Sequence, residues 1–207
     1  QSSLASHHPT GKVFTTDLRP DLSSACRVSD GSFEAPRVSD EGYLDFLRGI
    51  CLDNDINLVV PTIDTELAVL AHGKESFAAS GILLAVSSPE VCTTFHLKTT
   101  TESFFGEHGF LTPRILDDPL AGPFPQFAKL DDSSCSRGAT RVDDPAQAKA
   151  LRETDASYVF QEFVEGDEFT IDAFVDRHGD VAAVVPRLRL EVRAGEVSKA
   201  LAVKDAG

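Results

Sequence analysis

The spacing of apolar segments changes part-way along the chain, and this change limits the folds that the chain can adopt. Up to residue 88, short apolar runs at 12–17, 56–61 and 82–88 are separated by segments long enough for a helix. Such alternation is typical of a parallel sheet, because each parallel strand needs a crossover connection. We therefore predict a parallel, doubly wound α/β region here.

Two segments between these runs have helical periodicity. The first, 43–54, places Tyr43, Leu44, Leu47, Ile50 and Cys51 on one face. The second covers 65–81 and ends in a glycine, which is typical of a helix C-terminus. Both segments are predicted to pack against the parallel strands.

The chain after residue 157 has a different pattern. Apolar runs follow one another with only glycine-containing turns between them. The predicted strands are 157–164, 168–176, 181–192 and 197–203, joined at Glu165-Gly166, His178-Gly179 and Ala194-Gly195. This pattern predicts an antiparallel meander, and therefore an α+β region after the α/β region.

The middle of the chain mixes both kinds of element. In order, we predict helices over 89–95 and 98–108, a Pro/Gly-rich linker over 119–126, strands over 126–130 and 139–142, and a helix over 144–152. Asp144 followed by Pro145 is a typical helix start.

The composition excludes several classes of function. The 207 residues have a formal net charge of −14, and no apolar run approaches the length of a membrane span. A negative field repels phosphate backbones, so we expect no nucleic acid and no membrane as a partner. Four widely spaced cysteines without a CxxC pair are typical of reduced thiols, and we predict a cytoplasmic protein.

A lysine stands next to a hydroxyl-rich loop in the stretch KLDDSSCSRGATRV, where Lys129 ends a predicted strand. The loop residues suited to bind phosphate are Ser133, Ser134, Ser136, Arg137 and Gly138. Hydroxyls, backbone N–H groups and a cation can cradle phosphate oxygens, and glycine permits a tight turn. The same pattern is also typical of a solvated turn, so the residues alone leave both interpretations open.

A second stretch, QEFVEGDEFTID, contains five acidic and no basic residues between Glu162 and Asp172. Crowded carboxylates cost free energy unless they are paired. Ribose hydroxyls, an adenine amino group or a metal-bound phosphate would supply partners. An exposed acidic hairpin is the alternative.

Three stretches in this order and spacing resemble the ATP-grasp superfamily: FAKLDDSSCSRGATRV, VFQEFVEGDEFTIDAFVD and PRLRLEVRAGEVSKALAV. The nearest resemblance is to the branch similar to the large subunit of carbamoyl-phosphate synthetase. It implies a Rossmann-like preceding domain over 1–88, an ATP-grasp small subdomain over 89–160, and the start of a C-terminal subdomain with an antiparallel sheet over 161–207. Because the chain begins with Gln1, we interpret it as truncated at both ends.

The resemblance implies that ATP is clamped between two subdomains. Lys98 and Lys129 match the family's two phosphate-contacting lysines, and 133–138 matches the mobile loop over the phosphates. The residues expected at adenine and ribose are Gln161, Glu162, Phe163, Val164, Glu165 and Glu168, with Glu168 the better ribose match. Magnesium is implied as well, with its ligands expected beyond Gly207, and no metal ligand is assigned within the chain.

The substrate side is implied by four further residues. Arg187 and Arg189 match positions that contact the reacting groups, and Glu66 and Glu196 match positions expected to contact substrate. The activity implied is that of an ATP-dependent carboxylate–amine ligase acting through an acyl phosphate. Its partners would be a small carboxylate and a small amine, and the resemblance leaves a homodimer open.

Some positions depart from the family's pattern. Leu97 stands where an Asp usually precedes the first lysine, and Leu130, Asp132 and Cys135 replace a proline and loop glycines. Aspartates near phosphates repel them. These departures favour a second hypothesis, a catalytically weakened nucleotide-binding or regulatory protein. A third, a dinucleotide-binding oxidoreductase, would use Asp17 at the end of the first strand, although a turn-capping role suits Asp17 better.

Overall fold

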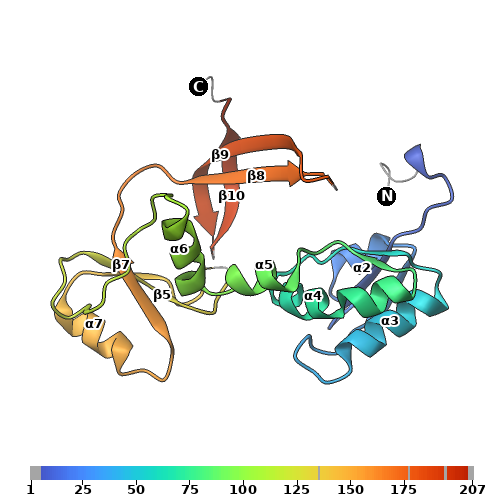
Figure 1. The fold of residues 1–207 in the computed structure, drawn as a ribbon, viewed down its shortest axis with the longest axis horizontal. Coiled ribbons are helices and arrows are strands. Elements are labelled where there is room, and N and C mark those ends of the chain that lie inside the picture. Colours follow the sequence, from blue (N-terminus) through green and yellow to red (C-terminus); the bar gives the residue numbers. More distant parts are fainter. Residues whose placement is uncertain (1–5, 135, 177, 194, 205–207) are drawn as a thin grey trace. The chain divides into compact units, whose positions relative to one another are not determined.

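The computed structural model describes residues 6–134, 136–176, 178–193 and 195–204. The chain divides into two compact units, Gln1–Thr93 and Thr94–Gly207, and Figure 1 gives the order of their elements. Among the described residues, no helix is both long and apolar enough to cross a membrane.

The first unit has the predicted alternation of strands and helices. Its strands pair in parallel, β1 with β2 and β3 with β4. The elements are β1 (Phe14–Asp17), α2 (Ser24–Val28), β2 (Gly31–Glu34), α3 (Tyr43–Asp53), β3 (Leu58–Val59), α4 (Asp64–Ala79) and β4 (Leu83–Leu84). The short α2 and β2 were not predicted, because neither segment has an apolar run.

The core of the first unit is built by the two predicted helices. Of the five residues predicted on one face of α3, Tyr43, Leu47 and Cys51 are buried and pack with Leu70 and Phe77 of α4. The other two, Leu44 and Ile50, are only partly buried. Ile82 and Leu84 complete the buried cluster. This face of α3 is therefore buried because its sequence period matches the helix period.

The second unit contains a three-stranded antiparallel sheet in the order β6-β5-β7. Its elements, together with the preceding helix α5 (Pro89–Thr94), are α6 (Lys98–Glu107), β5 (Gln126–Leu130), β6 (Thr140–Val142), α7 (Pro145–Arg152) and β7 (Tyr158–Glu162). Ala128, Val142 and Phe160 from the three strands form a buried cluster with Ala148 of α7. Helix α7 therefore covers one face of this sheet.

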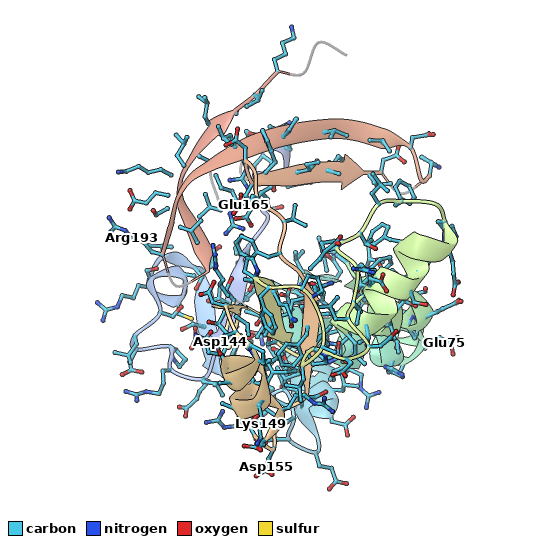
Figure 2. All side chains as sticks on the ribbon, turned by 90° about the vertical axis from the view of Figure 1, so that its left-hand side faces the viewer. Glu75, Asp144, Lys149, Asp155, Glu165 and Arg193 are labelled. Atoms are coloured by element: carbon cyan, nitrogen blue, oxygen red, sulfur yellow. The ribbon has the colours of Figure 1, made fainter. Side chains whose placement is uncertain are left out.

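The start of α7 follows the sequence signal. The side chain of Asp144 accepts a hydrogen bond of 2.9 Å from the amide of Gln147, and Pro145 opens the helix. Figure 2 shows Asp144 at one end of α7 and Lys149 on the same helix. The cap satisfies one of the free N–H groups of the first turn.

A second antiparallel sheet, in the order β10-β9-β8, consists of β8 (Phe169–Val175), β9 (Val181–Arg193) and β10 (Glu196–Ala202). This confirms the meander for these three strands, but the placement of the 157–164 strand in it was wrong. That strand, β7, pairs with β5 along one edge. Its other edge bonds to residues 114–116, which precede β5 in the chain. Leu116 N–H donates to the carbonyl of Phe160, and Glu162 N–H donates to the carbonyl of Arg114. No edge of β7 is left for β8.

The core of the first unit gives a stability prediction. Replacing Leu70 with Ala removes a side chain that is 1% exposed, and we expect a loss of about 2–5 kcal/mol in unfolding free energy. Leu52→Ala, at a side chain that is 55% exposed, is the control and should cost under about 0.5 kcal/mol. Equal losses for the two variants in urea unfolding would contradict the assigned core.

Candidate functional site

Lys129 lies on the face of the β6-β5-β7 sheet opposite to α7. Side chains alternate along β5, and Ala128 lies in the core that α7 covers. Lys129 therefore points to the other face, where its register partner is Val159 of β7. Phe127, with its partners Gln161 and Arg141, lies on the same face. The strand gives Lys129 a fixed base, as predicted.

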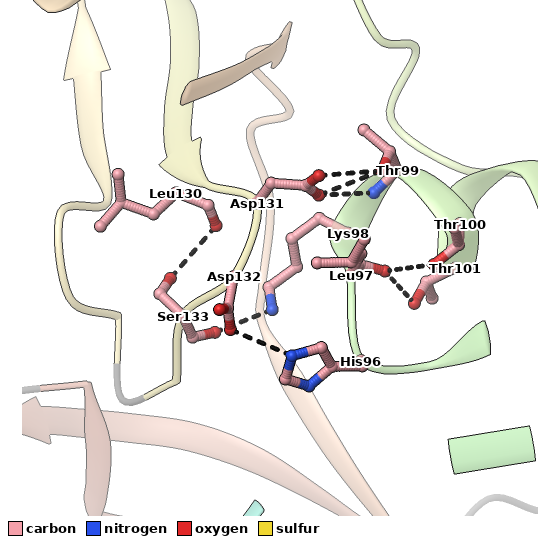
Figure 3. A network of polar contacts seen from close by, with 10 residues as sticks. All are labelled: His96, Leu97, Lys98, Thr99, Thr100, Thr101, Leu130, Asp131, Asp132 and Ser133. Atoms are coloured by element: carbon pink, nitrogen blue, oxygen red, sulfur yellow. Dashed lines mark hydrogen bonds and ion pairs between the residues drawn. The ribbon is translucent and has the colours of Figure 1, made fainter. Parts of the chain in front are cut away.

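Lys98 is the first residue of α6 and reaches the end of β5. Its amide donates to the carbonyl of Asp131 at 3.2 Å, and its ammonium donates to the carbonyl of Ser133 at 2.8 Å. Figure 3 shows Lys98 reaching toward the start of the loop that follows β5. The structure thus brings the first lysine into contact with the predicted phosphate loop.

The two lysines are also close enough to interact electrostatically. Burial lowers the pKa of Lys129, and the positive charge of Lys98 lowers it further. Asp131 acts in the opposite direction and raises the pKa of Lys129. Two ammonium groups from separate elements therefore share one partly buried region.

Asp131 supplies the cap that Leu97 lacks. Leu97 is the N-cap residue of α6 and makes no side-chain cap. The carboxylate of Asp131 instead accepts a hydrogen bond of 2.9 Å from the amide of Thr99 and bonds to its hydroxyl at 3.0 Å. The sequence carries no signal for this role, because Asp131 and Thr99 are distant in sequence.

The aspartates after β5 are engaged within the protein. Asp131 is bonded to Thr99, and Asp132 Oδ1 lies 3.3 Å from His96 Nε2. Figure 3 shows both contacts side by side. The expectation that Asp132 repels a phosphate assumed a carboxylate without a partner, whereas this one lies against His96.

The loop after β5 is held by a series of turns. Ser133 Oγ donates to the carbonyl of Leu130, and Arg137 N–H donates to that of Ser134. Gly138 has φ of +72°, and a Cβ there would lie 2.9 Å from Cγ of Leu130, so this position requires glycine. Ser136 also has a positive φ, of 52°. Cys135 lies outside the described residues.

The residues expected at the adenine and ribose, from Gln161 to Glu165, divide into buried and exposed members. Gln161 is buried and donates to the carbonyl of Pro113, and the Glu162 carboxylate accepts from the amide of Arg114. Phe163 lies under the guanidinium of Arg141, 4.8 Å from ring centroid to Cζ. The remaining two, Val164 and Glu165, are exposed. The Gln161 and Glu162 side chains thus bind the chain itself.

The predicted ribose and substrate residues form ion pairs in the second sheet. Glu168 pairs with Arg189, which also donates to the carbonyl of Gly195 at 3.0 Å. Arg187 holds Asp172 through two hydrogen bonds of 2.5 and 3.1 Å, and this contact keeps the pKa of Asp172 below its usual value. The side chain of Glu196 lies outside the described part of the chain.

Glu66 belongs to the first unit, in the first turn of α4. Its carboxylate accepts a hydrogen bond of 2.7 Å from the hydroxyl of Tyr43. Burial, followed by this hydrogen bond and the charge of Glu66, raises the pKa of Tyr43. Asp17 accepts from the amide of Arg19 at 2.9 Å, which is the turn-capping role that suits it.

Metal ligands were assigned to no residue of the chain. Within the residues that the structure describes, no three His, Cys, Asp or Glu side chains gather in a group that could hold a metal ion.

The N-terminal region matches a known family. Residues 2–85 match the family model of the PylC-like N-terminal domain. No curated protein matches the chain in a direct sequence comparison.

Solved structures match over most of the chain. The biotin carboxylase domain of Hydrogenobacter thermophilus 2-oxoglutarate carboxylase, in complex with MgADP, ADP and bicarbonate, has 12% identity and a TM-score of 0.66, over 92% of this chain and 47% of that one. L-Amino acid ligase from Bacillus licheniformis has 19% identity and a TM-score of 0.62, over 77% of this chain and 39% of that one. N5-carboxyaminoimidazole ribonucleotide synthetase from Thermotoga maritima has 17% identity and a TM-score of 0.60, over 88% of this chain and 49% of that one.

All three are ATP-grasp enzymes. The chain has the ATP-grasp fold. It covers less than half the length of each of these ATP-grasp structures. The resemblance to the carbamoyl-phosphate synthetase branch stays a prediction, as do the ranges of the three predicted regions.

The proximity of the two lysines can be measured directly. We expect Lys98→Met to raise the pKa of Lys129, because the variant removes the positive charge that lowers it. Titration of ¹³C-labelled lysine side chains by NMR would measure the change. Lys149→Met is the control, since Lys149 is 64% exposed and pairs with Glu153 on α7. An unchanged Lys129 titration in Lys98→Met would contradict the shared site.

Proposed function

We propose that the chain binds Mg-ATP as part of an ATP-dependent ligase that joins a small carboxylate to a small amine. One observation carries this proposal: Lys98, the first residue of α6, binds the loop that follows β5, the strand that carries Lys129. Two cations from separate elements therefore belong to one region, and the charge of Lys98 lowers the pKa of Lys129. A polyphosphate between them would offset the repulsion of these two charges. The ATP-grasp fold of the chain supports the same assignment.

The residues present fit a nucleotide in several respects. Lys98 and Lys129 would bind the phosphate groups, and the loop over 133–138 would cover them. The backbone of 163–165 would hold the adenine, because the side chains of the two preceding residues are occupied by Pro113 and Arg114. When bound, Mg-ATP supplies the phosphoryl group that activates a carboxylate as an acyl phosphate.

The ribose contact is better assigned to Glu165 than to Glu168. The carboxylate of Glu168 is neutralised by Arg189. Glu165 is exposed and, within the described residues, forms no hydrogen bond or ion pair. A carboxylate without a protein partner is free to accept hydrogen bonds from the ribose hydroxyls.

Water must be kept away from an acyl phosphate before the amine attacks. The loop after β5 suits this task, since Gly138 gives it a tight exit and Lys98 holds its first residue. Release of the Ser133 carbonyl by Lys98 would be needed when a phosphate takes its place. Binding of the nucleotide and movement of the loop would therefore be coupled.

Binding is tested by thermal unfolding. Millimolar Mg-ATP is expected to raise the melting temperature of the protein by a few degrees, because a ligand that binds only the folded state stabilises it. Lys129→Ala should abolish the rise, and Lys149→Ala should keep it. No rise in the unsubstituted protein at millimolar Mg-ATP would refute the proposed function.

Catalysis is tested separately, with hydroxylamine as a trap for acyl phosphates. A hydroxamate formed from a candidate carboxylate in the presence of Mg-ATP would support the ligase. Bound ATP without hydroxamate or phosphate release across a panel of carboxylates and amines would favour the weakened, regulatory protein instead. The departures at Leu97 and in the loop are the observation that keeps this alternative open.

A further inference from the structure

The contact between α6 and the end of β5 assigns a role to a residue outside the lysine pair. Lys98 is the first residue of α6, so its positive charge lies at the positive end of the helix dipole. A cation at this end is unfavourable, and Lys129 adds a second one nearby. Something must hold Lys98 there when no anionic ligand is bound.

The carbonyl of Ser133 binds the ammonium group itself, and Asp131 holds the start of the helix that carries it. The Asp131 carboxylate caps the amide of Thr99 at 2.9 Å, and the Asp131 carbonyl accepts from the amide of Lys98 at 3.2 Å. Both contacts join the first turn of α6 to the residue that follows β5, the strand that carries Lys129. Figure 3 shows the carboxylate facing Thr99, with Lys98 one residue away.

We propose that Asp131 is a positioning residue, which caps α6 from the end of β5 and thereby holds the ammonium group of Lys98 beside that of Lys129. The proposal rests on the proposed function for its effect on nucleotide binding. The geometric part is independent of any nucleotide. Leu97 is the N-cap residue of α6, and its side chain cannot accept a hydrogen bond from the first turn. The carboxylate of Asp131 accepts that bond instead.

The chain offers a matched control for the loss of a helix cap. Asp144 caps α7 with a hydrogen bond of the same length, 2.9 Å to the amide of Gln147, in the same compact unit. Asp131→Ala and Asp144→Ala are therefore expected to lower the melting temperature by similar amounts. If Asp131 only stabilised its helix, as Asp144 does, the two variants would also agree in Mg-ATP affinity and in the pKa of Lys129.

Mg-ATP affinity, measured by calorimetry, separates the two caps. Asp131→Ala is expected to weaken binding about fivefold, the factor that corresponds to the loss of one cap. The Mg-ATP affinity of Asp144→Ala should stay within about twofold of that of the unsubstituted protein. Adding Leu97→Asp to Asp131→Ala gives α6 a cap of its own and should restore the affinity. Equal affinities for the two alanine variants, or no recovery with Leu97→Asp, would overturn the proposal.

A second measurement needs no nucleotide, so failure of the proposed function can be told apart from failure of this inference. Lys98→Met is expected to raise the pKa of Lys129, and this rise measures how close the two ammonium groups are. The rise should shrink in an Asp131→Ala background and keep its size in an Asp144→Ala background. A rise of equal size in both backgrounds would overturn the proposal, whether or not the protein binds Mg-ATP.

Discussion

The second unit depends on keeping two like charges together. Like charges in one partly buried region repel each other, so such a pair needs compensation from its surroundings. The loop carbonyl of Ser133 accepts from Lys98, and Asp131 offsets part of the charge on Lys129. These contacts come from the end of β5 and the loop after it. The strand, the loop and the helix start therefore act as one element.

The side to which Lys129 points is decided by burial on the opposite face of β5. Ala128 lies in the core under α7, and β5 is paired along both edges. A shift of register by one residue would expose the core residues and bury the ammonium group. The hydrophobic pattern of β5 thus fixes the position of a charged group that is itself unsuited to the core.

Sequence patterns predicted what is local and missed what joins distant segments. The helix 43–54, the strand ending in Lys129 and the cap at Asp144 follow from periodicity and from neighbouring residues, and the structure confirms them. The bond from Thr99 to Asp131 joins residues with no common pattern. The prediction also paired the 157–164 strand with the wrong neighbour. An apolar run shows that a strand is buried but does not show which strand lies beside it, and β7 pairs with β5.

The contacts of the acidic stretch from Glu162 to Asp172 change the interpretation of its charge. Crowded carboxylates indicated a missing ligand, yet the chain itself supplies partners for three of them: the backbone amide of Arg114 for Glu162, and the guanidinium groups of Arg189 for Glu168 and of Arg187 for Asp172. Their pairing explains how the stretch tolerates its charge without any nucleotide. The case for ATP therefore does not rest on the acids. It rests on Lys98 and Lys129, because Lys98 binds the loop that follows the strand carrying Lys129, which brings two cations into one region of a chain with net charge −14.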